Sequence, residues 1–246
     1  FKRAIHLGIV GYDPCRYIEY PREEKKEVRV LSKSNQRKLS NAISPQFQNN
    51  TLMPALLAMH AGLRIGEVSA LKVEDINMED RLIRIDESLN RVMTFEQDGS
   101  TCCPLIYQST KSGKVRFVPM NEDLYKALDT YMNTMPQAYK RNGNAPLFLT
   151  SRETVMEPRR INYHFKKLLN KLNIQDIHFH CLRHTFATRA LEAGIPIKYC
   201  STMLGHASTG ITENLYAHAS EEQLRKEIKK LDISYIPVSA ACRIVQ

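Results

Sequence analysis

His180-Cys181-Leu182-Arg183-His184-Thr185-Phe186-Ala187 is the stretch of this 246-residue sequence that best predicts its fold and chemistry. His180 and Arg183 lie three residues apart, so a helix beginning here would present an imidazole and a guanidinium on one face. Leu204-Gly205-His206 follows, and Tyr216 comes ten residues after His206. This order supplies a phenol nucleophile, imidazoles that can accept a proton and a cation for phosphate oxygens.

A second arginine, Arg64, follows Gly62-Leu63, where a helical pattern that starts at Thr51 ends. A guanidinium never deprotonates and donates two parallel hydrogen bonds, which suits the non-bridging oxygens of a scissile phosphate. We therefore expect Arg64 and Arg183 to clamp one phosphate. Glu67, three residues after Arg64, would orient that guanidinium, although a surface ion pair explains it equally well.

Tyr216 is the expected nucleophile. A free tyrosine has a pKa of about 10, so only about one in a thousand is ionised at neutral pH, and nearby cations must offset that deficit. The usual role of a tyrosine is a packed core aromatic, and this chain has eleven. The position of Tyr216 after the Leu204-Gly205-His206 motif favours the nucleophile.

The proton-handling groups are assigned around this phenol. His180 would take the Tyr216 proton, and His206 would donate a hydrogen bond to phosphate. Lys111 lies in the expected Lys111-Ser-Gly-Lys114 turn, from which an ammonium could protonate the leaving 5′ oxygen. Lys114 and Arg116 compete with Lys111 for that role.

The same histidine-rich run also admits a zinc site, because imidazoles four residues apart beside a thiol can bind zinc. The run His178–His184 lacks the glutamate of an HExxH motif and has no second cysteine pair. We expect no metal and no other cofactor.

Composition fits a globular protein with an anionic partner. Hydrophobic residues make up 43% and charged residues 25% of the chain, and the formal net charge is +9. A basic surface favours nucleic acid, because phosphates neutralised by Lys and Arg release counterions. The six cysteines form no CxxC pair, which is typical of reduced thiols in a cytoplasmic protein. No apolar run approaches the roughly 18 residues of a membrane span.

Hydrophobic periodicity predicts an α+β fold that is mostly α-helical. A strand is expected over 81–86, an extended hairpin over 88–110 that turns at 97–100, and a third strand over 115–118, which gives a small three-stranded antiparallel sheet. The expected helices are 51–61, a short one over 67–71, 121–135, 158–172, 182–192, 196–204, 212–219 and 221–231.

The two ends of the chain differ from this pattern. Residues 22–38 are charged and poor in apolar periodicity, so a solvated connector is the first interpretation and a DNA-gripping strap the second. Residues 236–245 form an apolar tail with no core of its own, which would pack on this domain or on another subunit. The first residues, Phe1-Lys2-Arg3, have no initiator Met, and we expect the sequence to begin inside a longer product.

Together these motifs resemble the catalytic domain of tyrosine recombinases, the phage-type integrase family, and most of all a conjugative-transposon integrase. Several ordered motifs between about residues 45 and 220 carry the resemblance. They are His60-Ala-Gly-Leu-Arg-Ile-Gly-Glu67, Lys111-Ser-Gly-Lys-Val-Arg-Phe-Val-Pro119, His180-Cys-Leu-Arg-His-Thr-Phe-Ala187, Leu204-Gly-His206 and Asn214-Leu-Tyr-Ala-His218.

The resemblance implies a mechanism and a pocket. Tyr216 would attack a DNA phosphate, form a 3′-phosphotyrosine and release a 5′-hydroxyl, without ATP or metal. Arg64, Lys111, His180, Arg183 and His206 would surround Tyr216, with Glu67 in support. Lys111 is chosen over Lys114 because it stands five residues before Arg116, as in many relatives.

The resemblance also implies an organisation and partners. Residues 1–21 would end a truncated core-binding domain, 22–44 would be a basic interdomain linker, 45–231 the catalytic domain and 232–246 a tail exchanged between subunits. The long hairpin resembles the β-insertion of conjugative-transposon integrases. The partners would be double-stranded DNA, a homotetramer on two duplexes and an accessory directionality factor, in the bacterial cytoplasm at the nucleoid. The expected DNA contacts are Lys33, Arg37, Lys38, Lys114, Arg116, Arg159 and Arg160.

Three alternatives remain open at this point. A type IB topoisomerase uses similar tyrosine chemistry but rejoins the same strand. A non-catalytic DNA-binding relative would keep the fold alone. A zinc-dependent hydrolase built on His178–His184 would be sensitive to chelators.

Overall fold

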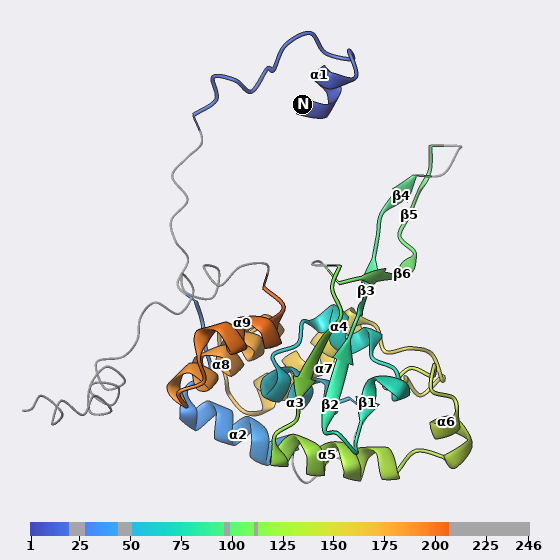
Figure 1. Cartoon of the computed structure of the whole chain (residues 1–246), viewed down its shortest axis with the longest axis vertical. Helices are drawn as coiled ribbons and strands as arrows, with labels where there is room; N and C mark the ends of the chain where they lie inside the picture. The colour runs from blue at the N-terminus through green and yellow to red at the C-terminus, as the bar shows by residue number, and fades with distance from the viewer. Residues whose placement is uncertain (20–27, 44–50, 96–98, 111–112, 207–246) are drawn as a thin grey trace, which may run out of the picture.

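The computed structural model describes residues 1–19, 28–43, 51–95, 99–110 and 113–206 (Figure 1). Its helices are α1 (Lys2–His6), α2 (Lys33–Ile43), α3 (Met53–Ala61), α4 (Ile65–Ala70), the 3-10 helix η2 (Val73–Asp75), α5 (Glu122–Asn133), α6 (Gln137–Arg141), α7 (Pro158–Lys171), α8 (Phe179–Glu192) and α9 (Ile197–Leu204). Its strands are β1 (Ile76–Asn77), β2 (Leu82–Ile85), β3 (Glu87–Arg91), β4 (Thr94–Phe95), β5 (Thr101–Cys102), β6 (Leu105–Ser109) and β7 (Arg116–Pro119). The predicted mostly helical α+β class is confirmed.

Helix α3 is the centre of the body and is apolar on every side except at His60. It contacts α2, α4, α5, α7 and α8. The helix ends at Gly62, whose φ of +67° is left-handed. A Cβ at Gly62 would lie 2.5 Å from the Phe186 ring of α8. Glycine therefore lets α3 end directly against α8.

The small sheet runs in the order β1-β2-β7 and is antiparallel. Strands β2 and β7 correspond to the predicted strands 81–86 and 115–118. The pairing places Ile83 opposite Val118 and Ile85 opposite Arg116. The third member, β1, was not predicted, because two residues carry no periodic pattern.

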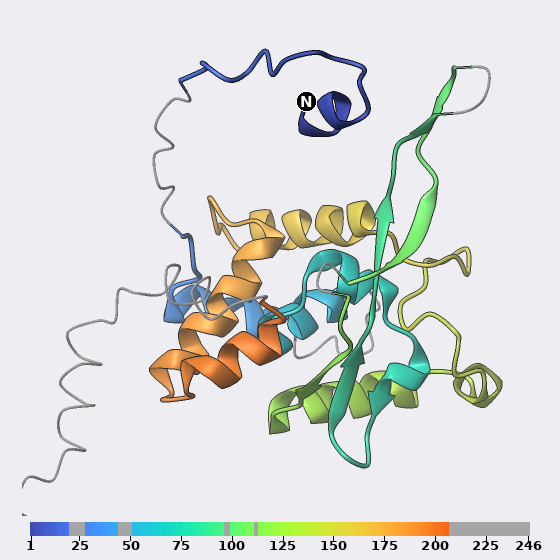
Figure 2. The same ribbon diagram turned by 45° about the horizontal axis from the view of Figure 1, so that its top comes forward.

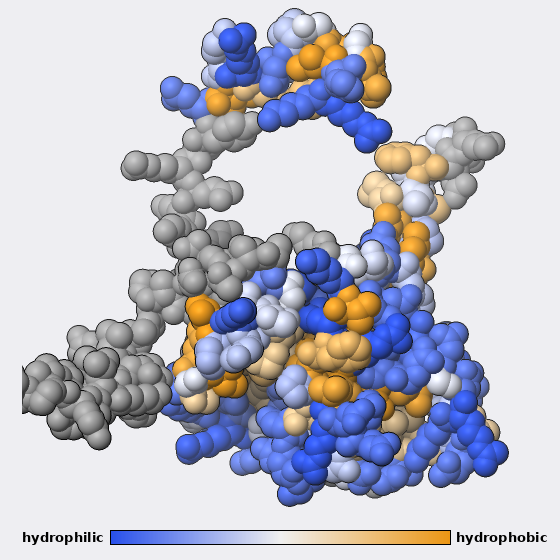
Figure 3. All heavy atoms as spheres, viewed as in Figure 1, coloured by the Kyte–Doolittle hydropathy of each residue, from blue (hydrophilic) through white to orange (hydrophobic). Residues whose placement is uncertain are grey.

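The predicted extended hairpin is formed by β3 and β6, and β4 pairs with β5 farther out. It projects from the body in both views (Figures 1 and 2). Apolar colour continues along the projection (Figure 3), where Met93 is 63% and Phe95 76% exposed. The predicted turn at 97–100 lies partly outside the described residues, between β4 and β5.

The prediction of an interdomain linker over 22–44 is wrong for its second half. Residues 33–43 form α2, which buries Leu39 and Ile43 in the core. Leu31 is fully buried, its N–H donates to the Thr185 hydroxyl over 2.9 Å, and its carbonyl accepts a hydrogen bond from Arg189. These contacts attach the segment to α8. The many charged residues of the segment hid the few apolar positions that would have predicted a packed helix.

Helices α5, α7, α8 and α9 match the predictions closely, whereas α6 was not predicted. Asn121 caps α5 by accepting a hydrogen bond from the Leu124 N–H over 2.9 Å. Helix α8 begins at Phe179, three residues before the predicted start, and α9 ends at Gly205 with φ +65°. The predicted helices 212–219 and 221–231 and the apolar tail lie outside the described residues. Among the described helices, none is long and apolar enough to cross a membrane.

Candidate active site

Arg64 stands at the junction of α3 and α4 with an extended backbone (φ −75°, ψ 152°). Glu67, one helical turn later, accepts the Arg64 backbone N–H at Oε2 and its guanidinium at Oε1, both over 2.8 Å. The Glu67 side chain is 2% exposed, whereas that of Arg64 is 30% exposed. Glu67 therefore orients Arg64, as predicted, and it does so from the interior.

A third arginine completes this cluster. Arg116 of β7 binds Glu67 in a bidentate pair, with Nη1–Oε1 and Nη2–Oε2 distances of 3.1 and 2.7 Å. Its Nε also donates to the Met203 carbonyl of α9 over 2.9 Å. A Cβ at Gly205 would lie 3.0 Å from Arg116 Cδ, so glycine there accommodates the arginine.

Arg116, which we predicted to contact DNA, has a side chain that is 7% exposed and is held by Glu67 and Met203. Strand alternation could have revealed this. Arg116, Val118 and Met120 are buried, and Phe117 and Pro119 between them are exposed. In this alternation the Arg116 side chain points inward, on the same side as the buried apolar residues. A charged residue at such a position is typically buried with a partner of opposite charge.

Arg183 joins three of the sequence motifs. It is 2% exposed, and its Nη1 and Nη2 donate to the Gly62 and Leu204 carbonyls over 2.8 and 2.6 Å. These carbonyls belong to the ends of α3 and α9, so one guanidinium connects both helix ends to α8. The motifs around Arg64, Arg183 and His206 are therefore adjacent in space, as the sequence predicted.

The histidines lie in this positive environment. His180 and His184 are one turn apart on α8, with ring centroids separated by 4.5 Å. Burial, followed by the charges of Arg183, Arg64 and Arg116, lowers the pKa of His206 to about 4. Burial and then Arg183 and Arg64 also lower the pKa of His180. Both imidazoles are neutral at pH 7 and can accept a proton or a hydrogen bond.

The carboxylate of Glu67 stays charged. Burial by itself would raise its pKa, but hydrogen bonds and charge from Arg116 and Arg64 outweigh burial and lower it. The buried cluster of Glu67, Arg64 and Arg116 therefore carries a net positive charge beside a further cation, Arg183. Such a fixed cationic environment stabilises a phosphate that gains negative charge during reaction.

Two of the predicted catalytic residues, Lys111 and Tyr216, lie outside the described residues. Thr110, Gly113 and Lys114, which flank Lys111 and Ser112 in the sequence, are described. The Thr110 hydroxyl donates to the Lys114 carbonyl over 3.1 Å, and Gly113 has a φ of +65°. Lys114 is exposed.

The remaining predicted DNA contacts are surface residues. Lys33, Arg37 and Lys38 lie exposed on α2, where Lys33 also pairs with Glu192 over 3.3 Å. Arg159 and Arg160 lie exposed at the start of α7. The structure therefore leaves these cations accessible.

The described ranges contain no group of three His, Cys, Asp or Glu side chains placed to hold a metal ion. Within the histidine-rich run, the Cys181 thiol and His178 Nδ1 are 3.4 Å apart. The three guanidinium groups around His180 and His206 make a cationic surrounding, which suits an anion and opposes a metal ion.

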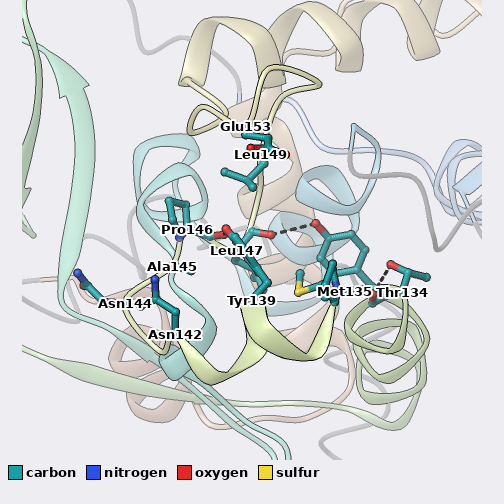
Figure 4. Close-up of a pocket in the computed structure, with 12 residues that line it drawn as sticks. Thr134, Met135, Tyr139, Asn142, Asn144, Ala145, Pro146, Leu147, Leu149 and Glu153 are labelled. Atoms are coloured by element: carbon teal, nitrogen blue, oxygen red, sulfur yellow. Dashed lines mark hydrogen bonds between the residues drawn. The ribbon is translucent and has the colours of Figure 1, made fainter.

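The surface formed by the described residues includes two hollows of note. One, of about 460 Å³, is lined by Arg64, Glu67 and His180 together with residues of β3 and β6. The other, of about 560 Å³, lies between α5, α6 and the loop before α7 (Figure 4). There the Tyr131 and Tyr139 hydroxyls donate to the Leu147 and Pro146 carbonyls. Only the first hollow adjoins the arginine cluster.

Comparison with known proteins agrees with this arrangement. The model of the phage integrase family matches residues 29–223. The chain is 28% identical to a XerC-like tyrosine recombinase of Caldanaerobacter subterraneus subsp. tengcongensis, over 96% of this chain and 63% of that protein. It is 30% identical to tyrosine recombinase XerD of Staphylococcus epidermidis, over 91% of this chain and 69% of that protein. The chain thus spans less than two thirds of the first of these relatives.

Solved structures show the same fold. The Tn1549 transposon integrase in complex with a circular intermediate DNA superposes with a TM-score of 0.71 at 24% identity, covering 94% of this chain and 75% of that one. The XerA recombinase gives a TM-score of 0.60 at 25% identity, covering 84% and 66%. From the family match and the shared fold we conclude that the chain belongs to the phage integrase family, whose members it matches here are tyrosine recombinases.

Proposed function

We propose that this chain is the catalytic part of a site-specific DNA recombinase that integrates and excises a mobile element. The observation that carries the proposal is the set of bonds from Arg183 to the ends of α3 and α9, which gathers Arg64, His180 and His206 into one cationic site. The integrase of transposon Tn1549, whose structures are complexes with transposon DNA, supports DNA as the substrate.

In the proposed cleavage, the Tyr216 phenol oxygen forms a bond to the scissile phosphorus and the bond from phosphorus to the 5′ oxygen breaks. His180 accepts the phenol proton, and Lys111 gives a proton to the departing 5′ oxygen. Arg64 and Arg183 bind the non-bridging oxygens and stabilise the charge of the pentacoordinate transition state. Strand transfer is the reverse step with the 5′-hydroxyl of a partner strand, so the bond energy stays in the covalent intermediate.

Helix α7 supports a DNA-facing surface beyond the predicted contacts. Its inner face buries Ile161, Phe165, Leu168 and Leu169, and its outer face is basic. The exposed residues are Arg159, Arg160, Tyr163, Lys166, Lys167, Asn170 and Lys171. The outer face would bind phosphates along the duplex, where Lys and Arg release counterions.

The proposed assembly is a homotetramer on two duplexes in the bacterial cytoplasm at the nucleoid, with an accessory directionality factor. Residues 232–246 would dock on a neighbouring subunit. Deletion of 236–246 should then weaken synapsis of two duplexes more than binding of one duplex, as measured by gel shift. A Tyr216→Phe variant keeps the tail and serves as the control. Synapsis that is unchanged by the deletion would contradict docking in trans.

The test of the catalytic proposal is covalent capture of DNA. The full chain is incubated in EDTA with nicked duplexes of randomised sequence, and adducts are separated by denaturing electrophoresis and mapped to a peptide. We expect an adduct at Tyr216 that the Tyr216→Phe variant does not form. An adduct at another tyrosine, or none at all with DNA binding retained, would overturn the proposal. Relaxation of supercoiled DNA without strand exchange would favour the topoisomerase instead.

A further inference from the structure

The hollow beside Arg64 has a charged end and an uncharged end. Arg64 and Glu67 form the charged end, with the neutral imidazole of His180 beside them. The rest of the wall that reaches it from the hairpin is polar without charge, and consists of Ser88, Asn90, Gln108 and Ser109. Its volume of about 460 Å³ lies in the roughly 300–1,000 Å³ range of ligand pockets.

Strand register explains how Ser88, Asn90 and Gln108 reach the hollow. Ser88 pairs with Gln108 and Asn90 with Ile106, and directly opposite residues share a face of an antiparallel ladder. Leu89, between Ser88 and Asn90, points to the other face and is fully buried. One face of the hairpin therefore packs on the body. The other face, which carries the Asn90 and Gln108 amides, lies toward the start of α4.

Gly66 fixes how closely that face approaches the arginine cluster. A Cβ at Gly66 would lie 2.5 Å from Ser88 Oγ and 3.0 Å from Asn90 Oδ1. Asn90 Nδ2 also donates to Ser88 Oγ over 2.9 Å, which holds the amide in place. A side chain at position 66 would have to displace Ser88 or Asn90, and glycine avoids this. Asn90 and Arg64 line the same hollow.

The chemistry of this wall differs from that of a phosphate site. Phosphates are bound by cations, whereas Asn and Gln amides pair their donor and acceptor with base edges. A phosphate held by Arg64 is covalently joined to a nucleoside on either side. The next groups that a bound strand brings into the hollow are therefore a sugar and a base.

We propose that Asn90 and Gln108 bind the base edge of a nucleotide adjacent to the scissile phosphate, with Ser88 positioning Asn90. This inference rests on the proposed function, because it needs a phosphate at Arg64. It makes the root of the hairpin a specificity-determining part of the active site, separate from the projecting end.

The test combines single amino-acid substitutions in the chain with single missing bases in the DNA, and measures the rate of adduct formation for each combination. Asn90→Ala and Gln108→Ala are compared with matched changes on exposed residues away from the hollow, Asn133→Ala on α5 and Gln137→Ala on α6. The substrate is a nicked duplex enriched from the randomised pool by binding to the Tyr216→Phe variant, intact or with an abasic residue on either side of the cut. Adduct formation is timed, and equilibrium binding is measured in a Tyr216→Phe background.

With intact DNA, each hairpin variant should lose about tenfold in rate or affinity, in line with one specific base contact. The loss should disappear when the abasic residue occupies the contacted position, and the two matched variants should behave as wild type. An equal loss on intact and abasic duplexes, or no loss, would overturn the inference. Absence of any adduct from the unsubstituted chain would instead count against the proposed function, and the binding measurement would still decide the base contact.

Discussion

The arginine cluster and the projecting hairpin differ in how each is held. In the cluster, Glu67 binds Arg64 and Arg116, Arg116 binds Met203, and the buried Arg183 joins two helix ends. In the hairpin, Leu89 at the root is fully buried, but Phe95 near the far end is 76% exposed. The cluster is held by several ionic and hydrogen-bonded partners, which preorganises charge for catalysis, whereas burial along the described hairpin falls from its root to Phe95.

The largest effect should come from removing the charge at the centre of the cluster. Glu67→Gln leaves Arg116 buried without its carboxylate, and breaking a buried ion pair costs about 3–5 kcal/mol of unfolding free energy. Urea unfolding measures the loss. Glu122→Gln, which breaks the exposed pair with Arg81, is the matched control and should change the unfolding curve little. A Glu67 variant as stable as the control would show that the cluster does not hold the site together.

A smaller loss is expected from adding one methyl group beside Arg116. Gly205 and Gly113 both have φ +65°, but a Cβ would meet Arg116 Cδ at 3.0 Å in the first and nothing within 4 Å in the second. Gly113→Ala should cost about 1–2 kcal/mol for the left-handed backbone alone. Gly205→Ala should cost about 2–4 kcal/mol, because overpacking adds to that term. Equal costs in urea unfolding would mean that Arg116 is free to move.

Acid should weaken the cluster before it affects the hairpin. Burial lowers the pKa of His184 and of His206 to about 4, below the value of about 6.5 for an exposed histidine. Between those pH values the unfolded chain binds more protons than the folded chain, so stability falls as the pH falls from 6.5 towards 4. His184→Gln should flatten this slope in unfolding curves recorded at several pH values. If the free energy of unfolding of the unsubstituted chain did not change between pH 6.5 and pH 4, this prediction would be wrong.

The sequence predicts the central helices and the arginine motifs better than it predicts α2 and the environment of Arg116. The resemblance of the ordered motifs to those of tyrosine recombinases predicted that Arg64, Arg183 and His206 meet, and Arg183 joins them through its bonds to two helix ends. The burial of Arg116 was not predicted, since the carboxylate that binds it is 49 positions away and strand parity was not applied. Helix α2 was missed because two buried residues among many charges give little periodic signal. Pairing across such distances is decided by the tertiary fold.

The smallest effect should come from the exposed end of the hairpin. Phe95→Ser removes an aromatic ring that is 76% exposed, so the free energy of unfolding should change by no more than about 0.5 kcal/mol. Leu89→Ala, in the same hairpin but fully buried, should cost about 2–5 kcal/mol through the lost packing and the cavity. Urea unfolding of both variants compares the two ends of one element. A large loss from Phe95→Ser would mean that the far end also packs on the body, and the contrast between a fixed cluster and a hairpin held at its root would fail.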